Sequence, residues 1–142
     1  MDVIKLQQEL IRDEGLYLDK YICPSGKPTI GVGHQLIGNE RHIKRITLKK
    51  AGEFLEEDIH DAQITLDRIF GNSWLSWTEA RQHALLNMAF NIGETRLRGF
   101  KNMIAAIKAQ DWPLASREVK DSLYYKKLTR RAERVRCAVL NG

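Results

Sequence analysis

The strongest constraint on the fold is a change of hydrophobic period near residue 16. Before that point apolar residues recur at helical spacing, and Gly15 stands where a helix beginning near Val3 would end. From residue 16 to residue 36 the pattern alternates roughly in twos around the turn sequence CPSGKP, and glycines are interleaved in TIGVGHQL. This segment predicts a small antiparallel sheet, which is too small to stand alone and must therefore pack on helices.

Most of the remaining chain predicts helices. From Thr47 onward a long apolar stripe is expected to face a core, and it consists of Phe54, Leu55, Ile59, Ala62, Leu66 and Ile69. The next helix has Thr78 as its N-cap and Gly93 as its stop. A last helix is opened by Thr129, and its inner face is formed by Leu128, Ala132 and Val135. The predicted class is α+β, mostly helical with one small sheet near the amino end.

The size and composition indicate one globular domain. The chain has 142 residues, of which 43% are hydrophobic and 29% are charged, so it can bury a core without disulfides or metals. We expect a single catalytic domain over 1–142, with a helix and small β lobe over about 1–46 and a helical lobe over about 47–142. The amino terminus lacks the features of a signal peptide, and no segment has the roughly 20 apolar residues of a membrane helix. We therefore expect the chain to fold in a cytoplasm.

The two cysteines are far apart in sequence. Neither Cys23 nor Cys137 lies in a pattern typical of zinc ligands or of a disulfide framework, so both are predicted to be reduced thiols. No spacing in the chain implies a metal or an organic cofactor. The net charge of +5, with the basic run KKLTRRAERVR near the carboxyl end, favours polyanionic partners such as nucleic acid, anionic lipid or wall polymers. The same run is also consistent with a solvated helix face.

Three chemically useful groups fall in or beside the predicted sheet. They are Glu14 at a helix end, Cys23 on the hairpin turn and Thr29 at the start of the returning strand. A lone glutamate before a glycine is usually a solvated helix terminus, so the spacing by itself is a weak indication of catalysis. The glycines Gly31 and Gly33 leave one strand face open, which allows either a sugar chain or a neighbouring backbone to approach closely.

Several motifs in order resemble one family. The segments DEG, TIGVGH, NMAFNIGET and SLYYKKLTRRAERV together are similar to the phage-type lysozymes, the endolysins of tailed bacteriophages. That family's signature is a Glu, eight residues, an Asp or Cys, five residues and a Thr, and Glu14, Cys23 and Thr29 meet it. The resemblance implies a lysozyme-like fold with a cleft between two lobes. The chain departs from the common pattern at Cys23, at Tyr124 and at Thr129, and the segment after His34 looks short enough to lack a small helix.

The resemblance also implies the reaction. The family cleaves the β-1,4 bond between N-acetylmuramic acid and N-acetylglucosamine in peptidoglycan, and Glu14 is then the candidate proton donor. Cys23 would act as a thiolate, favoured by nearby cations such as Lys20 or Lys27, and would either attack the anomeric carbon or orient water together with Thr29. Water orientation needs catalytic groups about 6.5–9.5 Å apart and direct attack about 5–5.5 Å, so both courses stay open.

Further positions are carried over from the family with less support. The candidate substrate-binding residues are Gln35, Phe90, Asn91, Met103 and Glu118. Their alternative role is ordinary packing or surface. The family match also places His34 near Asp58, for which we predict a structural ion pair.

The same resemblance suggests a biological setting. An endolysin of this kind is expected to be a monomer that acts on peptidoglycan glycan strands, without nucleic acid and without stable membrane insertion. It would accumulate in the host cytoplasm and reach the cell wall after a separate holin permeabilises the membrane. Two rival functions remain, namely a lytic transglycosylase that forms 1,6-anhydro products and an inactive wall-binding module.

Overall fold

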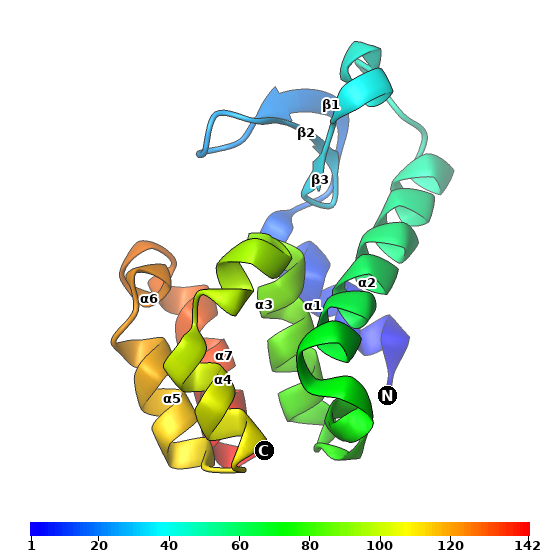
Figure 1. Cartoon of the computed structure of the whole chain (residues 1–142). Coiled ribbons are helices and arrows are strands. Elements are labelled where there is room, and N and C mark those ends of the chain that lie inside the picture. Colours follow the sequence, from blue (N-terminus) through cyan, green and yellow to red (C-terminus); the bar gives the residue numbers. More distant parts are fainter. The chain divides into compact units, whose positions relative to one another are not determined.

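The computed structural model describes residues 1–142 and divides into two compact units (Figure 1). We call Asp2–His60 the sheet unit, and Asp61–Gly142 together with Met1 the helical unit. The helix α2 (Leu48–Phe70) contributes to both, because the division falls within it. The predicted α+β class, helical with one small sheet near the amino end, is confirmed. The predicted division into lobes near residue 46 stays a prediction.

The sheet unit begins with a helix and a three-stranded sheet. Its elements before α2 are α1 (Val3–Glu14), β1 (Tyr17–Ile22), β2 (Pro28–Gly31), β3 (His34–Gln35) and the short 3-10 helix η1 (Gly38–His42). The strands are antiparallel in the order β1-β2-β3. The register places Tyr21 opposite Thr29, and Thr29 opposite Gln35. The segment after His34 holds the short 3-10 helix η1, and the absence of a small helix found in longer relatives stays a prediction.

A small core holds the sheet unit together. Ile30, Leu36 and Phe54 are almost fully buried, and Ile43 and Ile46 pack against them. This cluster joins the sheet to α2, since Phe54 comes from that helix.

A buried histidine adds a polar clamp to this core. The ring of His34 stacks on Phe54 with centroids 3.9 Å apart. Its two ring nitrogens lie 2.7 Å from a carboxylate oxygen of Asp58 and 3.0 Å from one of Glu40. Burial opposes a charged ring, but the hydrogen bonds and negative charges of Asp58 and Glu40 raise the pKa of His34 above its ordinary value overall. The predicted pair of His34 with Asp58 is confirmed.

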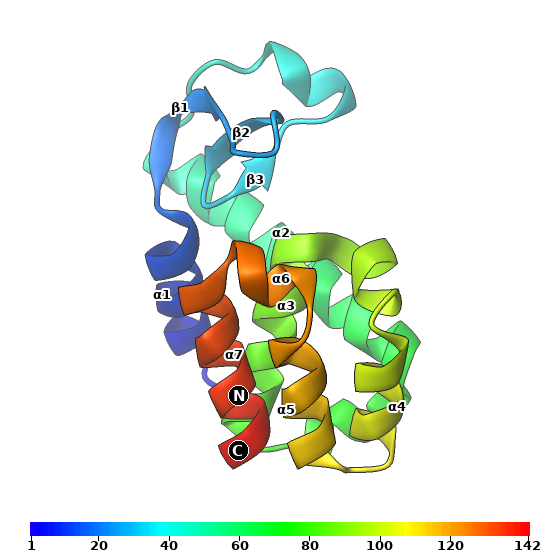
Figure 2. The same cartoon turned by 90° about the vertical axis from the view of Figure 1, so that its left-hand side faces the viewer.

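The helical unit is a bundle around α3. Besides the end of α2 it contains η2 (Gly71–Ser76), α3 (Glu79–Arg98), α4 (Lys101–Lys108), α5 (Trp112–Lys120), α6 (Leu123–Lys127) and α7 (Thr129–Asn141). Every residue from Gln82 to Ala89 is buried, so α3 is enclosed on all sides along this stretch. Helix α7 lies beside α3 and α5, and α4 lies beside α5 (Figure 2). None of the helices combines the length and apolar character needed to cross a bilayer.

Helix boundaries test the sequence signals in the helical unit. Thr78 caps α3 as predicted, because its hydroxyl accepts a hydrogen bond from the backbone of Arg81 at 3.3 Å. Gly93 does not stop the helix but kinks it, since its φ of 79° interrupts α3 and a further turn follows. Thr129 does not cap α7, because its hydroxyl instead donates to the carbonyl of Tyr125 at 2.9 Å.

The predicted apolar faces can be compared with the burial of their side chains. All six residues of the predicted α2 stripe are buried, which confirms that stripe. In the last helix Ala132 and Val135 are buried as expected. Leu128 is 40% exposed, so its assignment to the inner face is wrong.

Candidate active site

Glu14 is positioned by two glycines. Gly15 ends α1 with a φ of 78°, and its N–H donates to the carbonyl of Ile11 at 2.8 Å, so Glu14 projects from the last helical turn as predicted. The carboxyl group then lies against Gly33 in the turn between β2 and β3. A Cβ atom at Gly33 would fall only 2.8 Å from the carboxyl carbon of Glu14. Gly33 also has a φ of 62°, which side-chain-bearing residues rarely adopt. Glycine is therefore required where the half-buried acid meets the sheet.

Cys23 lies on the hairpin between β1 and β2. Its N–H donates to the carbonyl of Lys27 at 2.9 Å, and its carbonyl accepts from the N–H of Gly26 at 2.8 Å, which fixes the turn. The sulfur lies 2.9 Å from the hydroxyl oxygen of Ser25.

Neighbouring groups lower the pKa of the Cys23 thiol. Burial raises its pKa, but hydrogen bonds from Ser25, from the backbone of Lys27 and from Thr29 outweigh burial and lower the pKa to about 7. About half of the sulfur is therefore thiolate at neutral pH. The expectation that the positive charges of Lys20 or Lys27 stabilise the thiolate is wrong, because the stabilising groups are hydrogen-bond donors and only the backbone of Lys27 takes part.

Thr29 lies at the centre of the sheet face that carries the candidate groups. It is 2% exposed, and its hydroxyl donates to the carbonyl of Lys27 at 2.9 Å. A hydroxyl carries one proton, so Thr29 can serve either that carbonyl or the thiolate of Cys23 at any moment. Directly opposite residues of antiparallel strands project to the same face, so Tyr21, Thr29 and Gln35 share one face. Cys23 directly follows β1, in the turn that joins β1 to β2.

Tyr21 belongs to this group and was missed by the sequence reasoning. Burial is the largest cause that raises the pKa of its phenol, and the negative charges of Glu14, Tyr17 and Cys23 raise it further. The phenol is therefore neutral at physiological pH and lies within electrostatic reach of both Glu14 and Cys23. The available signal was the position of Tyr21, two residues before Cys23 in the sequence.

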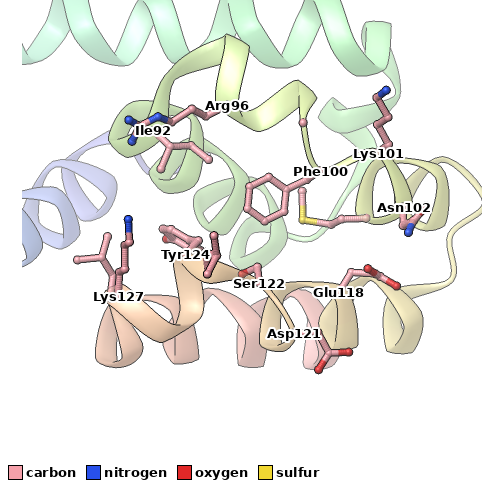
Figure 3. Close-up of a pocket in the computed structure, with 14 residues that line it drawn as sticks. Ile92, Arg96, Phe100, Lys101, Asn102, Glu118, Asp121, Ser122, Tyr124 and Lys127 are labelled. Atoms are coloured by element: carbon pink, nitrogen blue, oxygen red, sulfur yellow. The ribbon is translucent and has the colours of Figure 1, made fainter.

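The helical unit contains a separate cavity of about 770 Å³ (Figure 3). Met103 and Glu118, two of the predicted substrate-binding residues, line it. The aromatic rings of Phe100 and Tyr124 also line it, with centroids 6.3 Å apart. Phe90 and Asn91 do not line it. Both lie half-buried on α3, and the side-chain oxygen of Asn91 is buried without a hydrogen-bond partner.

The cavity carries charges of both signs. Figure 3 shows Arg96 and Lys127 toward one end and Glu118 and Asp121 toward the other. Such a lining suits a ligand that has both apolar surface and charged groups. The structure thus places Glu14, Cys23, Thr29 and Gln35 in the sheet unit, and Met103 and Glu118 in the lining of one cavity of the helical unit.

A small sheet that bears a hydroxyl, with an ionisable thiol on its hairpin and an acid at the end of the preceding helix, fits an enzyme of the glycosidase type. Comparison with known proteins makes this assignment specific. The phage lysozyme family model matches residues 12–134. The chain belongs to the phage lysozyme family, as the motifs in its sequence indicated.

Individual relatives agree with the family. The chain is 32% identical to the pre-baseplate central spike protein Gp5 of Enterobacteria phage T4 over 98% of its own length, but it spans only 28% of that protein. It is 27% identical to the probable T4-type lysozyme 2 of Dictyostelium discoideum, over 94% of this chain and 92% of that protein. It is 36% identical to the endolysin of Salmonella phage P22, over 63% of this chain and 62% of that protein.

Proposed function

We propose that the chain hydrolyses the β-1,4 bond between N-acetylmuramic acid and N-acetylglucosamine in peptidoglycan. The observation that carries the proposal is the carboxyl group of Glu14 held against Gly33, in the unit that also holds Cys23 and Thr29. Membership of the phage lysozyme family supports the same substrate.

In the proposed reaction Glu14 acts first, as the general acid. Its carboxyl proton passes to the glycosidic oxygen, the bond from that oxygen to the anomeric carbon breaks, and the sugar gains oxocarbenium character. Glu14 stands at the end of a helix, and because Gly33 has no side chain the carboxyl group can lie against the sheet. We propose that the proton is delivered there, in the unit that also holds Cys23 and Thr29.

Cys23 and Thr29 then complete hydrolysis. The thiolate takes a proton from a water molecule while the hydroxyl of Thr29 orients that water, and the water oxygen bonds to the anomeric carbon. A thiol pKa of about 7 makes Cys23 a competent base at neutral pH. We favour water orientation over direct attack because the Thr29 hydroxyl is close enough to the sulfur to contribute to its lowered pKa, and a hydroxyl can hold a water molecule beside it.

The cavity of the helical unit is proposed to bind the rest of the substrate. The rings of Phe100 and Tyr124 offer surfaces for sugar rings, and Arg96 and Lys127 offer cations for carboxylates of the attached peptides. Glu118 at the other end suits an amino group of the same peptides.

We propose host cell lysis as the biological role, with the chain made in the host cytoplasm and released by a separate holin. The similarity to the P22 endolysin supports this setting. The T4 relative is named as a baseplate spike protein, so a wall-cleaving unit within a virus particle is the second candidate setting. Either role has peptidoglycan strands as the partner, needs no nucleic acid and is compatible with a monomer.

Analysis of digestion products tests the proposed reaction. Purified peptidoglycan is treated with the enzyme, reduced with borohydride and separated by mass. We expect new reducing ends on N-acetylmuramic acid, which appear as muramitol. Products with a 1,6-anhydro ring would instead identify a lytic transglycosylase, and the absence of any soluble product would identify a wall-binding module. New reducing ends on N-acetylglucosamine would show that the other glycosidic bond is cleaved.

A further inference from the structure

The positive charge of the chain is concentrated in one segment. From Lys20 to Lys50 there are seven lysines and arginines and a single carboxylate, Glu40. This excess of six is larger than the net charge of +5 for the whole chain. Glu40 is engaged with His34 at 3.0 Å, so it is held on the core side of η1.

Part of the other basic run of the chain is used internally. In α7 the buried side chain of Arg131 donates to Asn87 at 2.8 Å, and Arg136 donates to Glu133 at 2.8 Å. These two cations are committed to contacts within the helical unit. Because the segment around β1 carries the larger excess of positive charge, it is the better candidate for recognition of an external anion.

Backbone pairing gathers several of these cations at the outer edge of β1. Asp19 pairs with Arg45 in an antiparallel bridge, and the N–H of Lys20 donates to the carbonyl of Lys44 at 2.9 Å. Lys20 thus lies opposite Lys44, and its ammonium group donates to the carbonyl of Arg41 at 3.4 Å.

The pairing of Lys20 with Lys44 is electrostatically unfavourable. Lys20, Arg41 and Lys44 are all exposed, and like charges directly opposite one another destabilise a strand pair. The neighbouring carboxylate of Asp19 is already paired with Arg45 at 3.6 Å. An anion bound from outside would offset the repulsion.

Two exposed isoleucines lie in the same segment as these cations. Ile22 follows Lys20 by two residues at the end of β1 and is 64% exposed. Ile37 is 67% exposed. It lies at the same end of the sheet, because the preceding Leu36 hydrogen-bonds to Pro28, which pairs with Ile22.

We propose that Lys20, Arg41 and Lys44, together with Ile22 and Ile37, form a docking surface for an anionic phospholipid bilayer. Lysines and arginines attract the negative headgroups, and exposed aliphatic side chains enter the boundary between headgroups and acyl chains. A nucleic acid or a wall phosphate polymer would satisfy the cations but would leave the two isoleucines in water. The association is peripheral, because it uses one edge of the sheet and no spanning helix.

Vesicle sedimentation tests the contribution of the cations. We expect the protein to bind vesicles containing phosphatidylglycerol and not vesicles of phosphatidylcholine alone, with binding that weakens as salt is added. The double variant Lys20→Gln/Lys44→Gln should bind about 25-fold more weakly, since each lysine near an anionic surface contributes about fivefold. The control Lys120→Gln/Lys126→Gln makes the same change of net charge in the helical unit and should bind like the wild type.

The isoleucines distinguish a bilayer from other polyanions. Ile22→Ser/Ile37→Ser should weaken vesicle binding about tenfold or more, and should leave binding of a fluorescent oligonucleotide or of polyphosphate unchanged. Peptidoglycan release by all variants should match the wild type. Thermal unfolding should show every variant folded, with Lys20→Gln/Lys44→Gln at least as stable as the wild type, because the repulsion between the two lysines is removed. Equal binding to neutral and anionic vesicles, equal binding by the two lysine double variants, or lysine-dependent binding of the oligonucleotide in preference to vesicles would overturn the proposal.

Discussion

In the sheet unit the groups assigned to chemistry lie on short strands and turns, and in the helical unit the groups assigned to binding line a cavity between helices. The sheet unit has a core of few residues and relies on glycine turns and on the paired His34 to fix its geometry. The helical unit encloses α3 in apolar side chains. The difference indicates that the sheet unit depends on specific polar contacts for precision, whereas the helical unit depends on packing. Four predictions test this comparison.

The largest of these effects is expected at Cys23. Cys23→Ala should lower kcat by about 10³-fold, because it removes the base that activates water. In the wild type the rate at which iodoacetamide alkylates Cys23 should rise as pH increases through about 7, where the thiol loses its proton. Cys23→Asp should retain activity, since its carboxyl ionises at a pH of about 4 and supplies the base at neutral pH. Full activity of Cys23→Ala in a turbidity assay would show that the sulfur contributes only to packing and not to catalysis.

The next effect concerns the contact between Gly33 and Glu14. Gly33→Ala should lower kcat by about 10²-fold, because the new Cβ atom displaces the carboxyl group. Gly38→Ala is the matched control, since Gly38 has a similar φ of 57° and nothing within 4 Å of the added atom. Both variants should lose about 1–2 kcal/mol in the free energy of unfolding from backbone strain. Equal activities of the two variants would show that the glycine does not position the acid.

His34 tests the polar clamp of the sheet unit. His34→Asn should lower the free energy of unfolding by about 2 kcal/mol, which is about 30-fold in the unfolding constant. Because Asp58 and Glu40 raise the pKa of folded His34, this stability is fully present below about pH 6.5, the ordinary value, and is lost as pH rises through the raised pKa. Urea unfolding at pH 5.5 and pH 9 should show the larger difference at pH 5.5. A difference independent of pH would mean that stacking on Phe54 matters more than charge.

The smallest effect is expected in the helical unit. Glu118→Gln should raise KM about fivefold and leave kcat unchanged, because it alters a charge in the cavity that is proposed to bind substrate. Lys108→Gln, a change of charge elsewhere on the helical unit, is the control. Kinetics on soluble peptidoglycan fragments would separate the two constants. A loss of kcat with constant KM would show that Glu118 acts in the chemical step and not in substrate binding.

The sequence predicted most of the fold because its local signals were consistent. The apolar stripe of α2, the Thr78 cap and the turn before β2 each combine a period with a matching terminus. Errors occurred where one residue type permits two outcomes. A glycine can end a helix or kink it, as Gly93 does, and a threonine before a helix can cap it or bond backward, as Thr129 does.

The assignment of the site residues stays a prediction. The motifs that contain Glu14, Cys23 and Thr29, together with those further along the chain, identified the family, which the family model confirms over residues 12–134. The origin of the lowered thiol pKa could not be predicted, since it depends on hydrogen bonds within the turn. Tyr21 was missed because the register that sets it opposite Thr29 appears only in the folded sheet. The cavity was also beyond sequence reasoning, because its lining comes from four helices.

The central claim is that the carboxyl group of Glu14 cleaves the glycan strand. The most direct measurement compares the lysis rate of chloroform-treated bacteria for the wild type, Glu14→Gln and the control Asp19→Asn, whose carboxyl is 73% exposed. We predict that Glu14→Gln loses at least about 10³-fold in rate while its thermal unfolding midpoint stays near that of the wild type, and that Asp19→Asn retains activity. Lysis by a folded Glu14→Gln variant at close to the wild-type rate would contradict the account.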